Sequence, residues 1–143
     1  MRAWRLARRP YADLSGEGAR RYGGRWNSPG RPVVYASADA ALSVLEVRVH
    51  LDLPPDLLPE DYVLMALDLD GIGAERLAAM PEDARAFGDA WLAEGRSAVL
   101  DVPSALVPES RNLLVNPVHP EAARAWIVSL RPFAFDRRLW LPL

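Results

Sequence analysis

The chain has 143 residues, half of them hydrophobic, and a net charge of −2, which suits one globular domain over residues 1–143. No apolar run reaches the roughly 18–20 residues that cross a bilayer, and no apolar stretch follows the N-terminal arginines as in a secretory signal, so we expect a cytoplasmic protein without a membrane partner. The chain has no cysteine and only two histidines, which excludes disulfides and thiolate chemistry and leads us to expect no metal site.

The N-terminal end of the chain is strongly basic. Residues 1–31 hold eight arginines against two acidic residues, a local charge of +6, whereas the remainder carries −8. We predict an edge strand over residues 1–6, where apolar and polar residues alternate loosely, and then a long loop over residues 10–31 with one helical turn near residues 18–21. A loop of that length is usually functional or disordered. The charge predicts binding of an anion, either nucleic acid or a nucleotide that carries a pyrophosphate.

The most distinctive motif lies at the end of this loop, where residues 22–30 read Tyr-Gly-Gly-Arg-Trp-Asn-Ser-Pro-Gly. Two glycines before Arg25 permit positive φ angles and a close approach of a ligand to the backbone. The planar guanidinium of Arg25 can bind phosphate or carboxylate through paired hydrogen bonds. A surface turn whose Trp26 packs on the core explains the same residues equally well, so both interpretations stay open at this point.

The remaining elements mix helices and strands without a strict alternation, which favours an α+β domain over a doubly wound parallel sheet. A helix capped by Ser37 or Asp39 runs to about His50, and Pro54 lies just beyond its end. A second helix ends at Gly95, which suits a left-handed C-terminal cap. In chain order we predict strand 33–36, helix 37–50, strand 62–69, a turn or helix over 74–79, helix 85–95, strand 97–102, strand 113–115, a helix or turn over 121–126, and strand over 127–132 and 133–135.

Glu46 and Tyr35 are candidate site residues. Glu46 shares a helical face with Leu42 and His50 in a largely apolar segment. Its carboxylate is therefore either exposed at the solvent edge of the helix or desolvated toward a cleft, where its charge can stabilise a developing cation. Tyr35, near the end of a predicted strand, is either a core aromatic or a floor for a planar ring.

Two further segments carry polar side chains. Ser104 follows a proline at the end of a predicted strand, where serine is often only a turn residue, and no Gly-x-Ser-x-Gly elbow or histidine–aspartate pair supports a serine hydrolase. Asn112, Asn116 and His119 offer hydrogen bonds either within a satisfied turn or toward a ligand. No phosphate-loop, dinucleotide-binding or helix-turn-helix pattern is present.

Taken in order, these pieces resemble the RES domain, the toxin half of Xre–RES toxin–antitoxin pairs. The family is named for an Arg, a Glu and a Ser, which match Arg25 in Gly-Gly-Arg-Trp-Asn, Glu46 in Ala-Leu-Ser-Val-Leu-Glu and Ser104 in Val-Pro-Ser. The resemblance runs through nearly the whole chain, and residues 81–87, ahead of Gly88, depart from the family pattern. The other matching segments are residues 4–5, 24–30, 35–37, 88–92, 102–108, 112–120 and 132–139.

The resemblance implies a fold like that of the ADP-ribosyltransferases and an enzyme that degrades NAD in bacterial cells. Such an enzyme cleaves the nicotinamide–ribose bond and transfers ADP-ribose to phosphate or water, as a NAD phosphorylase or glycohydrolase. NAD is then a substrate, with no cofactor and no metal, and an Xre-type antitoxin covers the active site; no direct contact with nucleic acid is expected. Arg25, Tyr35, Glu46 and Ser104 are expected to be catalytic, and Arg25, Trp26, Tyr35 and Asn112 are expected to bind NAD.

Each of these residues has an expected role. Glu46 stabilises oxocarbenium character at the nicotinamide ribose, Arg25 holds the pyrophosphate or an attacking phosphate, and Tyr35 stacks on nicotinamide or a ribose face. Ser104 bonds the ribose or orients a partner group. Three alternatives remain: an ADP-ribosyltransferase that modifies a protein target, an RNA-binding module that uses the basic N-terminal end, and a non-catalytic module that binds NAD without consuming it.

Overall fold

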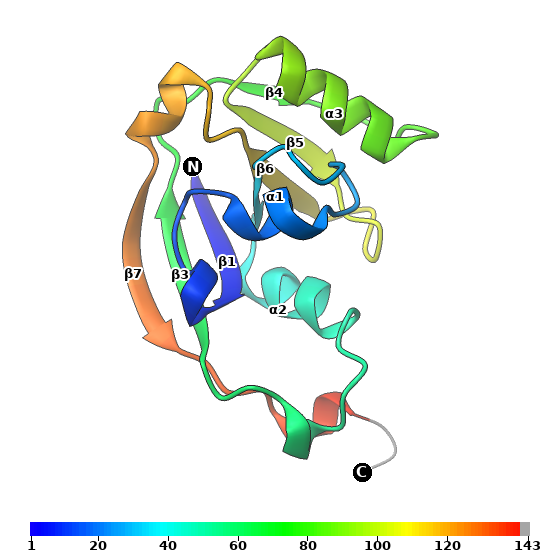
Figure 1. The fold of residues 1–143 in the computed structure, drawn as a ribbon, viewed down its shortest axis with the longest axis vertical. Coiled ribbons are helices and arrows are strands. Elements are labelled where there is room, and N and C mark those ends of the chain that lie inside the picture. Colours follow the sequence, from blue (N-terminus) through cyan, green and yellow to red (C-terminus); the bar gives the residue numbers. More distant parts are fainter. Residues whose placement is uncertain (141–143) are drawn as a thin grey trace.

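The computed structural model describes residues 1–140, which form an α+β domain on one seven-stranded sheet, as the sequence predicts (Figure 1). The strand order is β4-β5-β6-β2-β1-β3-β7, and β4 and β5 form its parallel pair. The strands are β1 (Arg2–Arg8), β2 (Val34–Ser37), β3 (Tyr62–Asp68), β4 (Ala74–Arg76), β5 (Val99–Pro103), β6 (Arg111–Val115) and β7 (Trp126–Pro132). The helices are α1 (Glu17–Tyr22), α2 (Ala40–Arg48) and α3 (Ala84–Glu94), with 3-10 turns η1 (Arg9–Tyr11), η2 (Pro55–Leu57), η3 (Pro120–Arg124) and η4 (Arg137–Leu139). Within residues 1–140 we find no helix with the length and apolar character needed to cross a bilayer.

The sheet is nearly divided in two at the junction of β1 and β2. These two strands are paired only at Trp4 and Ser37, whereas β1 pairs with β3 along its whole length and β2 pairs with β6 along its own. Beyond the Trp4–Ser37 pair, the carbonyl of Tyr35 accepts a hydrogen bond at 3.1 Å from Nη1 of Arg5, whose Nη2 donates to the Tyr11 carbonyl at 3.2 Å. An arginine side chain therefore joins the two halves of the sheet where the backbone ladder stops.

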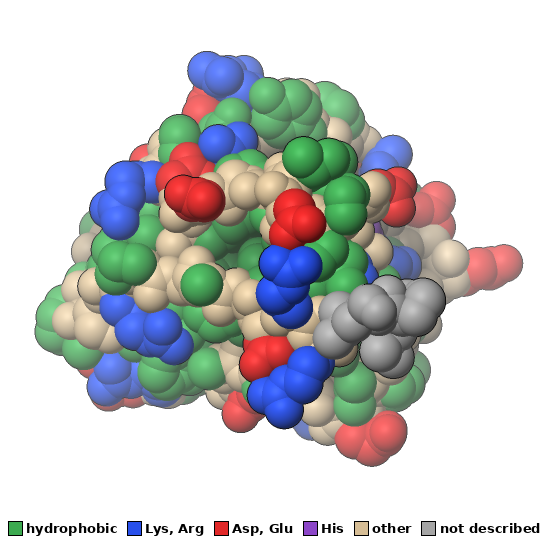
Figure 2. Space-filling model, turned by 90° about the horizontal axis from the view of Figure 1, so that it is seen from below, with side chains coloured by type: hydrophobic (Ala, Val, Ile, Leu, Met, Phe, Trp, Pro, Cys, Tyr) green, Lys and Arg blue, Asp and Glu red, His purple; other side chains and the backbone are tan. Residues whose placement is uncertain are grey.

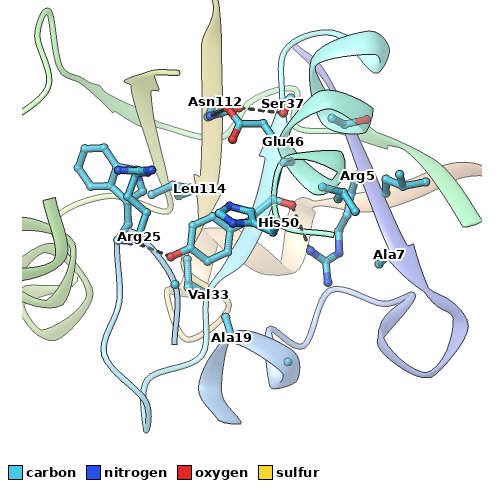
Figure 3. A pocket seen from close by; sticks show the side chains of 18 of the residues that line it. Arg5, Ala7, Ala19, Arg25, Val33, Ser37, Glu46, His50, Asn112 and Leu114 are labelled. Atoms are coloured by element: carbon cyan, nitrogen blue, oxygen red, sulfur yellow. Dashed lines mark hydrogen bonds between the residues drawn. The ribbon is translucent and has the colours of Figure 1, made fainter. Parts of the chain in front are cut away.

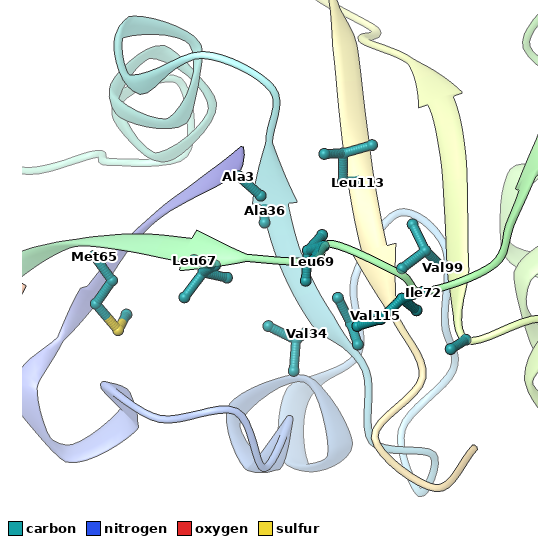
Figure 4. Close-up of a cluster of buried hydrophobic side chains, with 11 residues drawn as sticks. Ala3, Val34, Ala36, Met65, Leu67, Leu69, Ile72, Val99, Leu113 and Val115 are labelled. Atoms are coloured by element: carbon teal, nitrogen blue, oxygen red, sulfur yellow. The ribbon is translucent and has the colours of Figure 1, made fainter. Parts of the chain in front are cut away.

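Apolar side chains cover both faces of the sheet. Strands β3 and β6 contain continuous apolar runs, which is the pattern of strands buried on both sides. Neighbouring residues of a strand point to opposite faces: Leu113 and Val115 join the cluster drawn in Figure 4, whereas Leu114 packs beneath α3 with Trp91. The cluster of Figure 4 consists of Ala3, Val34, Ala36, Met65, Leu67, Leu69, Ile72, Ala98, Val99, Leu113 and Val115.

Helix α3 packs closely against the glycine-rich segment that precedes β2. A Cβ atom at Gly88 would lie 1.8 Å from the carbonyl oxygen of Trp26, so only glycine permits this approach of helix and loop. The next residue, Asp89, accepts hydrogen bonds from the backbone N–H and the hydroxyl of Ser28, at 2.8 and 2.6 Å. Helix α3 thereby fixes the loop that carries Arg25.

Helix α2 is fixed at both ends. Asp39, one of the two predicted caps, accepts a hydrogen bond at 3.2 Å from a backbone N–H of the first turn, and the helix ends at Arg48, two residues before the predicted end. The Arg48 guanidinium lies 4.1 Å from the ring centroid of Trp140, and its Nε donates to the Leu139 carbonyl at 3.0 Å. The C-terminal segment thus holds the helix that bears Glu46.

Three sequence predictions about individual elements are wrong. Strand β1 lies inside the sheet between β2 and β3, not at its edge, because its partners lie far along the chain and leave no trace in the local pattern. Residues 74–76 form strand β4, since parallel pairing with β5 overrides the weak strand propensity of Ala-Glu-Arg. Phe133 and Phe135 are not in a strand; their rings pack edge to face at 5.2 Å, and Phe135 does the same with Tyr62.

We predict that Gly88→Ala destabilises the domain. Alanine would favour the helix by about 1 kcal/mol, but its methyl group would overlap the Trp26 carbonyl and force α3 away from the loop. We expect a net loss of about 1–3 kcal/mol in the free energy of unfolding, measured by urea denaturation.

Gly73→Ala is the matched control, because a Cβ there would come no nearer than 3.7 Å to the side chain of Glu121. If Gly88→Ala unfolds at the same urea concentration as the wild type, the close packing of α3 on the loop is wrong.

Candidate functional site

A cleft of about 450 Å³ opens where β1 and β2 separate. Its walls come from β1, β2, β6, α1, α2 and the loop of residues 23–26, so that the two halves of the sheet face each other across it (Figure 3). Its volume lies in the lower half of the range of roughly 300–1,000 Å³ found for small-molecule sites. Arg25 and Glu46, the two residues around which the sequence predicts a site, both line it.

Glu46 is the acceptor at which three elements meet. Its Oε1 accepts hydrogen bonds from the Ser104 hydroxyl and from Nδ2 of Asn112, both at 2.7 Å. Ser104 follows β5 and Asn112 lies on β6, so α2 is joined to two strands at a single oxygen atom. Within residues 1–140 its Oε2 accepts no hydrogen bond. The half-buried carboxylate is therefore anchored through one oxygen and presents the other to the cleft.

Two buried serines orient the groups that donate to Glu46. The Ser37 hydroxyl donates to Oδ1 of Asn112 at 2.8 Å, which turns the amide nitrogen of Asn112 toward the carboxylate. The Ser104 hydroxyl donates its one proton to Glu46 and accepts hydrogen bonds from two backbone N–H groups of the following loop, both at 3.1 Å. The Ser104 hydroxyl and the Asn112 amide therefore both donate toward residue 46. An ionised carboxylate, which can only accept hydrogen bonds, suits this position.

Tyr35 ties the glycine-rich loop to the sheet. Its hydroxyl donates to Oδ1 of Asn27 at 2.7 Å and accepts from the backbone N–H of Trp26 at 3.0 Å. Asn27 is fully buried, and its Nδ2 donates to three carbonyls of the loop and α1. Burial raises the pKa of Tyr35 to about 12, while the hydrogen bond from Trp26 opposes the rise. The Tyr35 ring lines the cleft, so one residue both shapes the cleft and positions the Arg25 loop.

The side chain of Trp26 belongs to the core, which is the second of the two interpretations that the sequence left open. Trp26 is 3% exposed and packs edge to face on Phe87 at 6.4 Å, so it reaches the cleft only as part of its wall. Gly24 lies against Tyr35: a Cβ atom there would be 2.7 Å from the Tyr35 hydroxyl. The Gly-Gly pair therefore lets the loop pass over the tyrosine.

Three arginines line the cleft: Arg8 pairs with Asp61, whereas Arg5 and Arg25 form no ion pair within residues 1–140 and bring positive charge to the cleft. Arg25 is exposed and Arg5 is partly buried; in Figure 3 they flank the Glu46 group on opposite sides. Burial lowers the pKa of Arg5, and the charge of Asp13 opposes this effect. Nε of Arg5 is buried without a hydrogen-bond partner in the described part of the chain. Because guanidinium groups stay protonated in proteins, the cleft suits an anionic ligand.

Three of the eight arginines at the N-terminal end form ion pairs. Arg8 pairs with Asp61 at 2.9 Å, and Arg20 and Arg21 both pair with Glu17, at 2.6 and 3.2 Å. Arg20 lowers the pKa of the Glu17 carboxyl to about 2. Figure 2 shows arginines and carboxylates interspersed with apolar side chains on the face it views, not one basic surface. The face seen in Figure 2 therefore offers no extended basic surface of the kind that binds nucleic acid.

Sequence reasoning missed the roles of several residues that line or support the cleft. Arg5 was noticed only as part of a matching segment, and Ser37 only as a helix cap. His50 lies one helical turn beyond Glu46 and lines the cleft. Its four-residue spacing from Glu46 could have identified it as a cleft residue. Asn116 and His119 instead accept backbone N–H groups within turns. Within residues 1–140, no three acidic or histidine side chains gather as a metal-binding group.

Comparisons with known proteins agree with this architecture. A family model described as the RES domain matches residues 2–136. A protein of Pseudomonas putida named Toxin Res is 39% identical, over 96% of this chain and 98% of its own length. A protein of Sphingobium named Prs ADP-ribosylating toxin is 38% identical, over 95% of this chain and 94% of its own. In the crystal structure of the M. tuberculosis MbcT–MbcA toxin–antitoxin complex, one chain matches with a TM-score of 0.74 at 21% identity, covering 93% of this chain and 84% of that one; this last likeness concerns the fold.

We predict that Tyr35→Phe loosens the Arg25 loop. The substitution leaves the N–H of Trp26 and Oδ1 of Asn27 without their partner, which costs about 1–3 kcal/mol in the free energy of unfolding at neutral pH. Hydrogen exchange should show faster exchange of amides in residues 23–28. Unchanged exchange and unchanged stability would mean that the hydroxyl does not hold the loop.

The same tyrosine makes stability sensitive to alkaline pH. Its ordinary pKa of 10 rises to about 12 in the folded state, so the unfolded chain loses this proton at a lower pH than the folded one. The contribution is intact below pH 10 and is lost as the pH rises through about 12, with a total on the order of 2–3 kcal/mol. The wild type should therefore lose more stability than Tyr35→Phe between pH 10 and pH 12, in denaturant titrations. Parallel pH profiles of the two proteins would contradict this.

Proposed function

The chain belongs to the RES domain family, and from that premise and the geometry of the cleft we propose that it is the toxin of a toxin–antitoxin pair and cleaves the nicotinamide–ribose bond of NAD. The observation that carries this proposal is the anchored carboxylate of Glu46, with Oε1 held by Ser104 and Asn112 at 2.7 Å and Oε2 left to the cleft. NAD carries an anionic pyrophosphate and a cationic nicotinamide ring, which matches a cleft that holds the Glu46 carboxylate together with Arg5 and Arg25.

The reaction places its charge beside Glu46. When the bond between C1″ of the ribose and the nicotinamide nitrogen breaks, the electron pair goes to the nitrogen and cancels the positive charge of the ring. Nicotinamide leaves neutral, so no acid is needed, and positive charge moves to the ribose. A carboxylate fixed before the reaction stabilises that charge without having to reorganise. A new C1″–O bond then forms to phosphate or to water, and with water one proton passes to solvent.

The other cleft residues position the substrate and its reacting carbon. Arg25 binds phosphate oxygens through its planar fork, and Arg5 adds positive potential deeper in the cleft. The ring of Tyr35 supports nicotinamide or a ribose face. Ser104 and Asn112 hold Glu46 in place, and Asn112 has a second role in ribose contact. Trp26 packs in the core and forms part of the wall of the binding site. NAD is consumed as the substrate, and the chemistry calls for no metal or bound cofactor.

The biological setting follows from the same proposal. A toxin that destroys NAD acts in the cytoplasm and arrests growth unless a partner blocks it. We propose an Xre-type antitoxin as that partner, in line with the antitoxin partner named for the M. tuberculosis structure. Phosphate and water are both retained as acceptors.

A second candidate function is transfer of ADP-ribose to a protein. It is favoured by the Sphingobium relative, whose name describes an ADP-ribosylating toxin. The two functions share bond cleavage and differ only in the acceptor. Mass spectrometry of NAD incubated with the purified chain, with and without phosphate, separates them: free nicotinamide with ADP-ribose or ADP-ribose 1″-phosphate supports the first function. Nicotinamide release that depends on added protein, with label on that protein, supports the second, and no nicotinamide under any condition contradicts both.

We predict that Glu46→Gln abolishes most turnover and keeps the fold. The glutamine carbonyl oxygen can still accept from Ser104 and Asn112, so the change removes the charge and leaves the anchor. We expect a loss of about 10²–10³-fold in kcat for NAD cleavage, with a melting temperature close to that of the wild type. The control is Glu109→Gln, the same chemical change at an exposed position near Ser104. Wild-type turnover by Glu46→Gln would remove the carboxylate from the mechanism.

A further inference from the structure

We propose that the adenosine half of NAD binds in a second cavity, which shares Arg25 and three other lining residues with the main cleft; this inference rests on the proposed function. The second cavity has a volume of about 660 Å³ and is lined by Gly23, Gly24, Arg25, His50 and the segment of residues 80–85. The glycine pair, Arg25 and His50 line the main cleft as well. The two spaces therefore meet along a shared rim.

The position of Glu46 decides which half of the dinucleotide occupies which space. The reacting ribose carbon must lie beside this carboxylate, and Glu46 lines the main cleft but not the second cavity. The nicotinamide half therefore occupies the main cleft. That cleft has a volume of about 450 Å³, in the lower half of the usual range for ligand sites, and the second cavity adjoins its rim, so the rest of NAD can extend into that cavity.

Two guanidinium groups stand at the shared rim, where the pyrophosphate between the halves would lie. Arg85 donates from Nε and Nη2 to the Gly24 carbonyl, at 3.3 and 3.2 Å, which holds it beside the turn that carries Arg25. Within residues 1–140 its Nη1 makes no hydrogen bond, and neither does the guanidinium of Arg25. Both arginines thus keep N–H donors for phosphate oxygens, which guanidinium groups bind through paired hydrogen bonds.

The wall of the second cavity suits an adenosine. Met80 is 36% exposed although apolar, and Pro81 lies next to it, so a planar base can rest on a thioether and a proline ring. The exposed carboxylate of Glu82 follows, and carboxylates bind ribose hydroxyls in other dinucleotide sites.

The test compares NAD with nicotinamide mononucleotide, which lacks the adenylyl half. The wild type should cleave NAD with a kcat/KM at least about 10-fold above that for the mononucleotide, because remote binding energy contributes to catalysis. Met80→Glu should lower this ratio by about 10-fold, and the uncharged Met80→Gln should lower it in the same direction by a smaller factor. Val118→Glu, at an exposed apolar position outside both cavities, should keep the ratio.

A binding measurement covers the case in which the mononucleotide is not cleaved. AMP should bind the wild type in calorimetric titration and compete with NAD, and Met80→Glu should weaken AMP binding by about 10-fold. If Met80→Glu changes kcat/KM equally for NAD and for the mononucleotide, the inference is wrong. If it leaves the ratio of the two kcat/KM values unchanged but alters the phosphate requirement, the inference is also wrong and the cavity binds the acceptor. If the protein cleaves neither NAD nor the mononucleotide, the proposed function is refuted. The AMP titration would then still show whether this cavity binds adenosine.

Discussion

The cleft exists because β1 and β2 pair at a single position, Trp4 with Ser37. A fully paired sheet would leave no space between these strands, and the two walls of the cleft would be neighbours in a continuous ladder. Arg5 replaces the missing ladder bond by donating to the Tyr35 carbonyl. This partly buried side chain thus helps to join the two halves and adds positive charge to the cleft. A backbone carbonyl left unpaired there would be costly.

Around this opening, the Glu46 carboxylate and the backbone of the Arg25 loop are held by contacts within the protein. Glu46 is held by donors from the end of β5 and from β6, and the Arg25 loop is held by Tyr35, Asn27 and the close packing of α3. The carboxylate and the loop that carries the guanidinium therefore line the same cleft before any ligand arrives. Such preorganisation is what allows a fixed charge to lower a barrier in a partly enclosed site.

The sequence singled out several residues that line the cleft, but it did not predict how the cleft is formed. Arg25 and Glu46 stood out because a guanidinium between glycines and a carboxylate in an apolar helix need explanations. The α+β class followed from the mixture of periodic segments. What failed depended on distant pairing: β4 is a strand only because β5 lies beside it, and β1 is internal only because β2 and β3 flank it. The supporting role of Arg5 follows from the split in the sheet, which no local pattern encodes.

The most direct test of the central claim is a crystal structure of the Glu46→Gln protein soaked with NAD. The account predicts intact NAD with its nicotinamide ribose in the main cleft, C1″ within roughly 3–4 Å of the residue 46 side chain, and pyrophosphate oxygens at Arg25. NAD bound elsewhere, or bound with its nicotinamide ribose turned away from residue 46 while the cleft stands open, would contradict it.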